Sequence, residues 1–408
     1  MNSLLRDSRA RRLVIANLFS SVGSGITIVA VPWMLVNREG GNQTFGWTTF
    51  WTTVVLFLFI PYYGAWVDRH SRKAMLLWGE VFGFGATFCM ALVALVTGRV
   101  ETWQLVVTFF CGWLYYTLHY PAKFAFVQQI FDRSQYQALT SVMEVQGQIA
   151  SMAAGGIASL LIGRVELSTI LLVDASSYLV GLVLMGTIPY ESTHLQPGPA
   201  AAAASNAWHA VAEAWRWLAQ RRTLLWFFIC SFVPFLAVMV SNYLFPIYVS
   251  QILRATPAVY GIGEMAFAGG AVLAGLSVPL LTARIGQAKS TAALAGVFIL
   301  GGALLIIWPV TGVFYAALLF MGLGNAGVRV ARNVIVLHLV PNAIMGRVNV
   351  FFAAFERFWR TVLILTMTLG VDHLGARVCF ALLVVLNLGA FAGLLATRHA
   401  AEDSTQPA

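Results

Sequence analysis

The chain has 408 residues, of which 59% are hydrophobic and only 10% carry a charge. An ordinary water-soluble domain has about 25% charged residues, so this composition excludes a soluble fold. The net charge of +9 does not indicate a nucleic-acid partner, because the cations concentrate in alternate loops and form no basic run with interleaved aromatic residues. The four cysteines lie far apart in apolar segments without metal or redox spacing, and we expect no cofactor and no metal.

Stretches of about twenty mostly apolar residues follow one another along the whole chain. A helix of that length matches the roughly 30 Å hydrocarbon core of a bilayer, and lipid offers no hydrogen-bond partner to any other backbone conformation of a single segment. We therefore predict an all-α membrane protein with twelve transmembrane helices. The expected spans are 13–35, 45–66, 74–97, 101–122, 138–163, 167–188, 222–250, 258–281, 290–310, 312–337, 347–371 and 375–397.

The loop charges predict the orientation. With a cytoplasmic N-terminus, the inner loops and tails hold 16 cations and the outer loops hold 5, which favours both termini inside. The apolar stretch after the basic segment 1–12 continues to Pro32, too far for a signal peptide, and predicts an uncleaved first helix. We expect a multi-pass protein of the plasma (inner) membrane.

The longest break between apolar stretches divides the chain into six helices plus six. It predicts an N-terminal six-helix bundle over 1–188, a cytoplasmic linker over 189–221, and a C-terminal six-helix bundle with a short cytoplasmic tail over 222–408. Tryptophans near the end of the linker, at 208, 215 and 217, indicate a segment lying along the inner interface. Two halves of this kind are typical of a secondary transporter.

A basic motif separates the second and third predicted helices. It consists of Gly64, Asp68, Arg69, Arg72 and Lys73; the glycine would let the chain leave the second helix tightly. An ordinary positive-inside turn accounts for the cations but not for the order and spacing. The motif resembles the Gly-x-x-x-Asp-Arg-x-x-Arg-Lys signature of the major facilitator superfamily, which implies two pseudo-symmetric six-helix bundles.

The same resemblance implies a gate. Asp68 would meet the inner end of the eleventh helix, near Gly346 and Arg347, and hold the two halves together when the cavity faces outward. The positive end of the helix dipole makes that contact physically reasonable.

Further segments are similar to the macrolide and siderophore exporter branch, which includes the enterobactin exporter. They are 31–33 at the end of the first helix, 174–179 in the sixth, 244–248 with 260–261, and 341–348 before the eleventh. The fifth helix departs from the drug–proton exchangers: Gly147, Ser151, Met152, Gly155 and Gly156 keep the small residues but lack the central Gly-Pro. Export and proton coupling are therefore implied by the branch more than by that motif.

Charged residues cluster in the tenth and eleventh predicted helices. They are Arg329, Arg332, Glu356, Arg357 and Arg360, and each is costly inside a bilayer. In one interpretation Glu356 neutralises an arginine, Arg360 being four residues away, and the other cations reach the inner surface. In the other, the excess of cations attracts an anionic substrate. Family architecture places the tenth helix at the central cavity, which favours Arg329 and Arg332.

A proton carrier must be a buried acid that is reachable from both sides in turn. The acids inside predicted helices, besides Glu356, are Glu80, Glu144, Asp174 and Glu264. Glu144 lies in a polar stretch of the fifth helix, so we expect Glu144 and Glu356 as proton-coupling residues, against helix packing as the alternative role.

Polar and aromatic residues on several helices are candidates for the cavity wall. Asn17, Ser20, Ser21 and Ser24 share one face of the first helix, where they would line water or pack against another helix. Tyr116 and Tyr120 would stack on an aromatic ligand or anchor at the interface. The candidate substrate-binding residues are Asn17, Ser21, Tyr116, Tyr120, Asn242, Asn325, Arg329 and Arg332.

No motif for serine hydrolysis, zinc proteolysis or phosphate binding occurs, so we do not expect an enzyme. The leading hypothesis is a monomeric secondary exporter of small amphiphilic molecules, such as siderophores or macrolide-like drugs, working by alternating access and driven by protons. Its partners would be the small-molecule substrate, the proton and the lipid bilayer. A lysophospholipid facilitator and a solute importer of the same fold are the alternatives.

Overall fold

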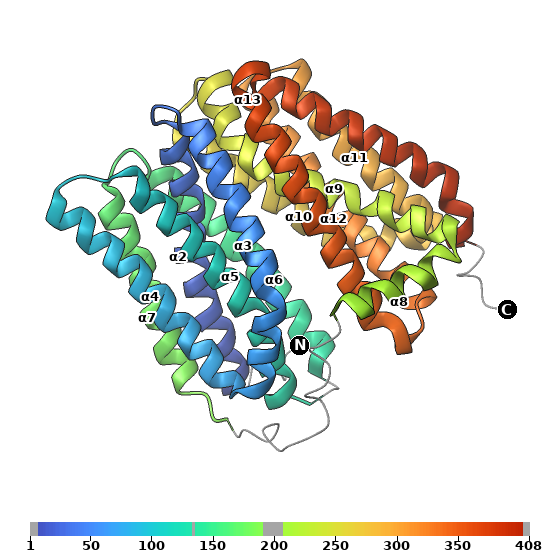
Figure 1. Cartoon of the computed structure of the whole chain (residues 1–408), viewed down its shortest axis with the longest axis horizontal. Helices are drawn as coiled ribbons and strands as arrows, with labels where there is room; N and C mark the ends of the chain where they lie inside the picture. The colour runs from blue at the N-terminus through green and yellow to red at the C-terminus, as the bar shows by residue number, and fades with distance from the viewer. Residues whose placement is uncertain (1–6, 133–134, 191–206, 403–408) are drawn as a thin grey trace. The chain divides into compact units, whose positions relative to one another are not determined.

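The computed structural model describes residues 7–132, 135–190 and 207–402. These residues form helices joined by short connections, with no strand among them beyond one isolated bridge between Ile162 and Val165 (Figure 1). The chain divides into two compact units, residues 1–204 and 205–408. The division falls inside the segment predicted as a linker.

The described part of unit 1 contains six long helices. They are α2 (Ser8–Val36), α3 (Gly41–Arg69), α4 (Arg72–Thr97), α5 (Thr102–Ile130), α6 (Tyr136–Leu161) and α7 (Leu167–Gly186). At 1.5 Å per residue they measure about 30 to 44 Å, enough to cross a bilayer. Helix α2 packs against α6 and α7, and α4 packs against α5 and α7. Helix α2 also contacts α5 and α3.

Unit 2 begins with a shorter helix. Its described elements are α8 (Ala207–Ala219), α9 (Arg222–Ile247), the π-turn η4 (Tyr248–Ile252), α10 (Pro257–Ile285), α11 (Gln287–Ile307), α12 (Thr311–Leu339) and α13 (Asn342–Glu402). Helix α13 is two helices joined at Gly375, whose φ of 78° interrupts the helical backbone. Figure 1 shows its two arms running in different directions. The amphipathic α8 buries Ala214 and Leu218 in the apolar core of this unit.

With α13 taken as two, the described residues contain six membrane-length helices in each unit, which confirms the predicted all-α membrane fold. By length and composition, eight of the described helices, with α13 taken as one, are apolar enough to cross a membrane. The other three long helices, α3, α5 and α6, have 26 to 29 residues, which is also long enough to cross a bilayer.

Several predicted helix ends differ from the structure, and the largest error is at the fourth helix, predicted to end at residue 122 but continuing as α5 to Ile130. Gly64 does not end the second helix, because α3 continues to Arg69 and stops at His70, whose backbone is extended. Only His70 and Ser71 separate α3 from α4, and the Ser71 hydroxyl accepts a hydrogen bond from the Ala74 amide as an N-cap. Pro32 lies within α2, which ends at Val36, one residue beyond the predicted end at 35, and the helix containing Gly346 begins at Asn342 in place of the predicted 347. A glycine or proline is a tolerated interior residue where neighbouring helices support the backbone.

Candidate functional site

Two cations of the basic motif bind carbonyl groups within unit 1. Arg72 Nη1 donates to the Ala125 carbonyl of α5 at 2.7 Å, and Lys73 Nζ donates to the carbonyls of Gly186 and Ile188, both at 2.7 Å. Gly186 is the last residue of α7, where the helix dipole favours a cation. Arg72 and Lys73 thus join the start of α4 to α5 and to the end of α7.

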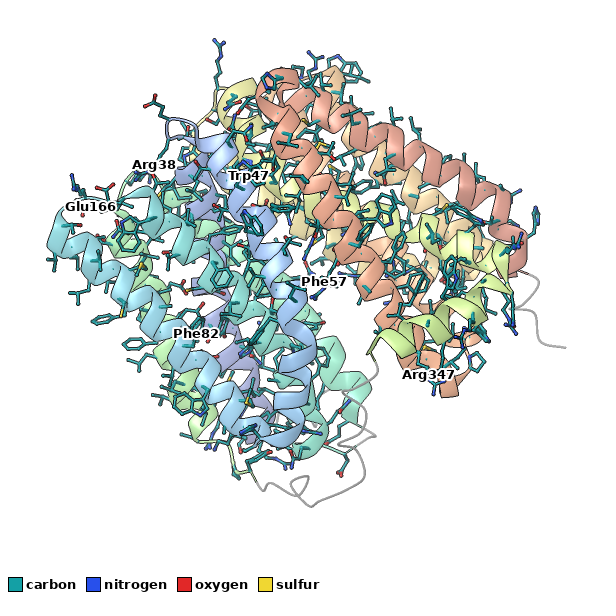
Figure 2. The ribbon with its side chains drawn as sticks, viewed as in Figure 1. Arg38, Trp47, Phe57, Phe82, Glu166 and Arg347 are labelled. Carbon is teal, nitrogen blue, oxygen red and sulfur yellow. The ribbon has the colours of Figure 1, made fainter. Side chains whose placement is uncertain are left out.

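The remaining part of the predicted gate is only partly described. The side chains of Asp68 and Arg69 lie outside the described residues, so the gate contact of Asp68 stays a prediction. Gly346 lies in the first turns of α13. Arg347 follows it and pairs with Glu213 of α8 at 2.8 Å; Figure 2 shows Arg347 at the end of α13 beside α8. No sequence pattern indicates this partner, although Glu213 lies in the segment predicted to follow the inner interface.

A buried carboxyl group lies at the centre of unit 1. Glu80 of α4 has no exposed surface. Its Oε2 accepts a hydrogen bond from the Ser20 hydroxyl of α2 at 2.9 Å, and its Oε1 accepts one from the Tyr115 hydroxyl of α5 at 2.9 Å. One acid therefore joins three helices. Gly181 of α7 leaves the necessary space, since a Cβ there would come within 2.3 Å of Ser20 Oγ and 2.7 Å of Glu80 Oε2.

His119 extends this network toward the start of α2. Its Nδ1 lies 3.5 Å from Glu80 Oε1, and its Nε2 lies 2.9 Å from Asn17 Oδ1. Because an amide oxygen only accepts hydrogen bonds, the hydrogen of a neutral His119 lies on Nε2 in this arrangement. The lone pair of Nδ1 then faces the Glu80 carboxyl group.

A second buried acid lies further along α2. Asp174 of α7 is 1% exposed, and its Oδ2 accepts a hydrogen bond from the Thr27 hydroxyl at 2.6 Å. Its Oδ1 has no hydrogen-bond partner among the described residues. Asp174 also lines a cavity of about 10 Å³ between α2, α4, α5 and α7, which is the space that one water molecule needs.

The polar face of α2 is therefore occupied by protein. Asn17, Ser20 and Ser24 are buried, and Ser21 is half-buried. The sequence left two interpretations of this face, lining water or packing against another helix. Asn17 and Ser20 pack against other helices, since Asn17 contacts His119 and Ser20 contacts Glu80. A role in substrate binding for Asn17 and Ser21 stays a prediction.

An aromatic row follows one face of α5. Tyr116 and Tyr120 are 51% and 48% exposed, and their rings stack with centroids 6.3 Å apart. Trp113 contacts Tyr116, and Phe124 contacts Tyr120, with centroids 6.2 Å and 4.9 Å apart. This row offers flat apolar surface with hydroxyl groups to a ligand or to an interface.

Unit 2 holds a buried cation on α12. Arg332 is 5% exposed, and its guanidinium lies 3.6 Å from the ring centroid of Phe232 on α9. Its hydrogen bonds are long, 3.5 Å to the Ser231 carbonyl and 3.4 Å to Asn333 Oδ1. Its Nε has no partner, and no carboxylate among the described residues pairs with it. Within the described part of the chain, the charge of Arg332 therefore meets an aromatic face and weak polar contacts.

The other candidates of unit 2 have different surroundings. Asn325, 6% exposed with Oδ1 unpartnered among the described residues, shares the helix face of Arg332 with the half-buried Arg329. Glu356 lies 3.5 Å from Arg360, which confirms the predicted pairing. Asn242 on α9 is half-buried.

The sequence did not favour Glu80 or Asp174 as a proton carrier. It favoured Glu144, whose side chain lies outside the described residues. Glu80 and Ser20 are 60 residues apart, and Asp174 and Thr27 are 147 apart, so no local pattern connects them. The sequence marks this place only by two glycines. In the structure, a Cβ at Gly83 would meet Tyr178, and a Cβ at Gly181 would meet Glu80. Among the described residues, no group of three His, Cys, Asp or Glu side chains is arranged to hold a metal ion.

Fold and composition together define a multi-pass, all-helical membrane protein. The family model described as Major Facilitator Superfamily matches residues 13–364, and the chain belongs to this superfamily. Among curated relatives, macrolide efflux protein A of Streptococcus pyogenes is 21% identical over 372 residues, covering 89% of each chain. Macrolide efflux protein A of Enterococcus faecalis is 23% identical over 261 residues, or 63% of this chain and 78% of the relative.

Solved transporter structures share the fold. A bacterial homologue of the iron transporter ferroportin in an inward-facing state has a TM-score of 0.73 at 15% identity, covering 96% of this chain and 98% of the other. The nucleoside transporter NupG has a TM-score of 0.72 at 14% identity, covering 96% and 100%. A bacterial homologue of the lysosomal transporter Spinster has a TM-score of 0.70 at 11% identity, covering 99% and 100%. At these identities the likeness concerns the fold alone.

Proposed function

We propose that this protein is a secondary exporter of small amphiphilic molecules, with macrolide-like drugs as the first substrate class. The supporting observation is the similarity to macrolide efflux protein A, which extends over 89% of both chains. The protein would lie in the plasma membrane with both termini in the cytoplasm, as the loop charges predict.

The site chemistry supports an amphiphilic substrate. The Tyr116–Tyr120 row presents exposed rings and hydroxyl groups on one helix, and such surface binds ligands that combine apolar and polar parts. Energy would come from the proton gradient, since the sequence has no phosphate-binding loop and unit 1 buries two carboxyl groups without a lysine or arginine partner among the described residues. Transport would proceed by alternating access between the two halves.

Expression in a bacterial host without its own macrolide exporters tests this proposal. We expect the chain to raise erythromycin resistance and to lower the accumulation of radiolabelled erythromycin. Collapse of the proton gradient with an uncoupler should restore accumulation. Unchanged resistance with confirmed membrane expression would contradict export of macrolides.

A second substrate class is favoured by Arg332. A buried guanidinium that no carboxylate among the described residues contacts suits an anionic ligand, since its planar fork binds carboxylates in pairs of hydrogen bonds. A siderophore with acidic groups fits this chemistry, whereas a cationic macrolide does not. A strain lacking the chain should then secrete less siderophore under iron limitation. If siderophore secretion were unchanged and lysophospholipid movement between leaflets were altered, the lipid facilitator would be favoured. If secretion were unchanged and solute uptake were altered, the importer would be favoured.

A further inference from the structure

We propose that Glu80 and Asp174 form the proton-binding site of this transporter, and that His119 shares one proton with Glu80. This inference rests on the proposed proton-driven function and assigns it to unit 1. It differs from the sequence prediction, which favoured Glu144 and Glu356. Glu356 has a cation, Arg360, beside it at 3.5 Å, whereas no lysine or arginine among the described residues pairs with Glu80 or Asp174.

The first argument is the geometry between Glu80 and His119. With Asn17 Oδ1 accepting from Nε2, the bare Nδ1 of His119 lies 3.5 Å from Glu80 Oε1. A carboxylate oxygen and a nitrogen lone pair repel each other at this distance, and one added proton converts the contact into an attraction. The pair therefore has a place for a single proton. After the proton leaves, the Ser20 and Tyr115 hydroxyl groups still donate to both oxygens of the carboxylate.

The second argument is the water-sized cavity beside Asp174. Its Oδ1 is buried, has no hydrogen-bond partner among the described residues, and belongs to a side chain that lines the small cavity. The cavity has room for one water molecule, and its polar lining includes Ser24 and Thr27. A water there would accept a proton from Asp174 or return one. Ser20 and Thr27 are seven residues apart, so the two acids bind α2 at levels about 10 Å apart.

Few other titratable groups lie near this site. Helix α5 contributes Cys111, Tyr115 and His119, with Lys123 one turn beyond His119. Helix α7 contributes Tyr178. The facing part of α2 contributes amide and hydroxyl groups only. The side chain of Glu144, on the neighbouring α6, lies outside the described residues. Protonation of the two carboxyl groups therefore decides most of the local charge.

Protonation also has a mechanical consequence. Both acids accept hydrogen bonds from α2, Glu80 from Ser20 and Asp174 from Thr27. Hydrogen bonds to a carboxylate are roughly twice as strong as those to a neutral carboxyl group. Binding of protons therefore loosens α2 from α4 and α7, and release of protons tightens it. In this way the site would couple proton binding to movement of one helix.

Infrared difference spectroscopy of the purified full-length protein tests proton binding without any substrate. Titration from about pH 5 to about pH 9, a range that buried carboxyl groups reach, should remove the carbonyl band of protonated carboxyl groups in the wild type. Glu80→Gln and Asp174→Asn should each reduce this band. Glu166→Gln, which removes an exposed carboxyl group at the start of the same α7, should leave it unchanged. An equal band in all four proteins would overturn the proposal.

Transport in proteoliposomes then separates a proton role from a packing role. With erythromycin as the probe, Glu80→Gln and Asp174→Asn should abolish uphill transport driven by a pH gradient but retain counterflow without a gradient. Loss of counterflow in well-folded variants would show that the carboxyl groups only hold the helices together, and would refute the proposal. If the wild type moves no erythromycin, macrolide export fails, and the infrared titration still decides the proton site.

Discussion

Buried charges differ in this protein according to whether they have a partner. Glu356 has Arg360, whereas Arg332 has an aromatic ring and two long hydrogen bonds. An uncompensated buried charge costs several kcal/mol by desolvation, and residues that bear such a cost are commonly functional. The difference in pairing therefore separates a structural ion pair from a candidate ligand site on α12.

Replacement of Arg332 tests this distinction. Arg332→Gln should abolish export of an anionic probe such as enterobactin and raise the midpoint temperature of unfolding, because the desolvated charge is removed. Arg332→Lys keeps the charge but loses planar stacking on Phe232, so export should fall without being abolished. Arg216→Gln, at an exposed position of α8, is the matched control. Unchanged enterobactin export in Arg332→Gln would rule out the anion role.

The gate prediction concerns Asp68. Asp68→Asn should lose transport while it retains expression and the unfolding midpoint, because an amide cannot provide the negative charge that would meet the N-terminal end of the eleventh helix. Asp132→Asn removes an exposed acid elsewhere in unit 1 and should transport normally. Erythromycin accumulation in cells measures both variants. Normal transport by Asp68→Asn would refute the gate role.

At the scale of helices, close packing depends on single glycines. A Cβ at Gly270 of α10 would lie 2.0 Å from the Leu319 carbonyl oxygen, and one at Gly322 of α12 would lie 2.0 Å from the Phe267 carbonyl oxygen. The two backbones are therefore in direct contact, as small residues allow in membranes. No sequence motif singled out these positions among the 36 glycines, because the contact depends on which faces of α10 and α12 meet.

A pair of adjacent substitutions tests this contact. Gly270→Ala should destabilise the protein by about 1–3 kcal/mol, because a carbonyl group of the backbone cannot move aside. Gly269→Ala places its Cβ where no atom lies within 4 Å, and the better helix propensity of alanine should make it neutral or slightly stabilising. Thermal unfolding in detergent compares the two variants. Equal midpoints would contradict the proposed backbone contact.

At the scale of the whole molecule, the orientation is still a prediction from charge. A green fluorescent protein fused to the C-terminus should fluoresce, since it folds in the cytoplasm. Alkaline phosphatase fused after Gly98, in a predicted outer loop, should be active because it folds outside. Fusion of the same enzyme after His70, in a predicted inner loop, is the inactive control. The opposite pattern would reverse the orientation and, with it, the assignment of the gate to the inner side.

Helix lengths and the number of membrane segments followed from the sequence with errors of a few residues at most ends. The larger errors, at the end of α5 and at the start of α13, arose where local signals were overridden by packing in an environment without water. Arg332 and Asn325, two of the predicted substrate-binding residues, are buried on one face of α12, and their role in binding stays a prediction. The pairing of Arg347 with Glu213 was not foreseen, because it depends on where α8 packs.

The amino-acid sequence by itself determined that this chain is a membrane protein, that it is helical, and to which superfamily it belongs. These properties depend on apolar length, the absence of water as a hydrogen-bond partner, and one local motif. Only the tertiary structure decided which polar groups meet. Glu80 contacts Ser20 and Tyr115, and Asp174 contacts Thr27, across separations of 35 to 147 residues. Such contacts arise from the packing of helix faces, which no short pattern along the chain records.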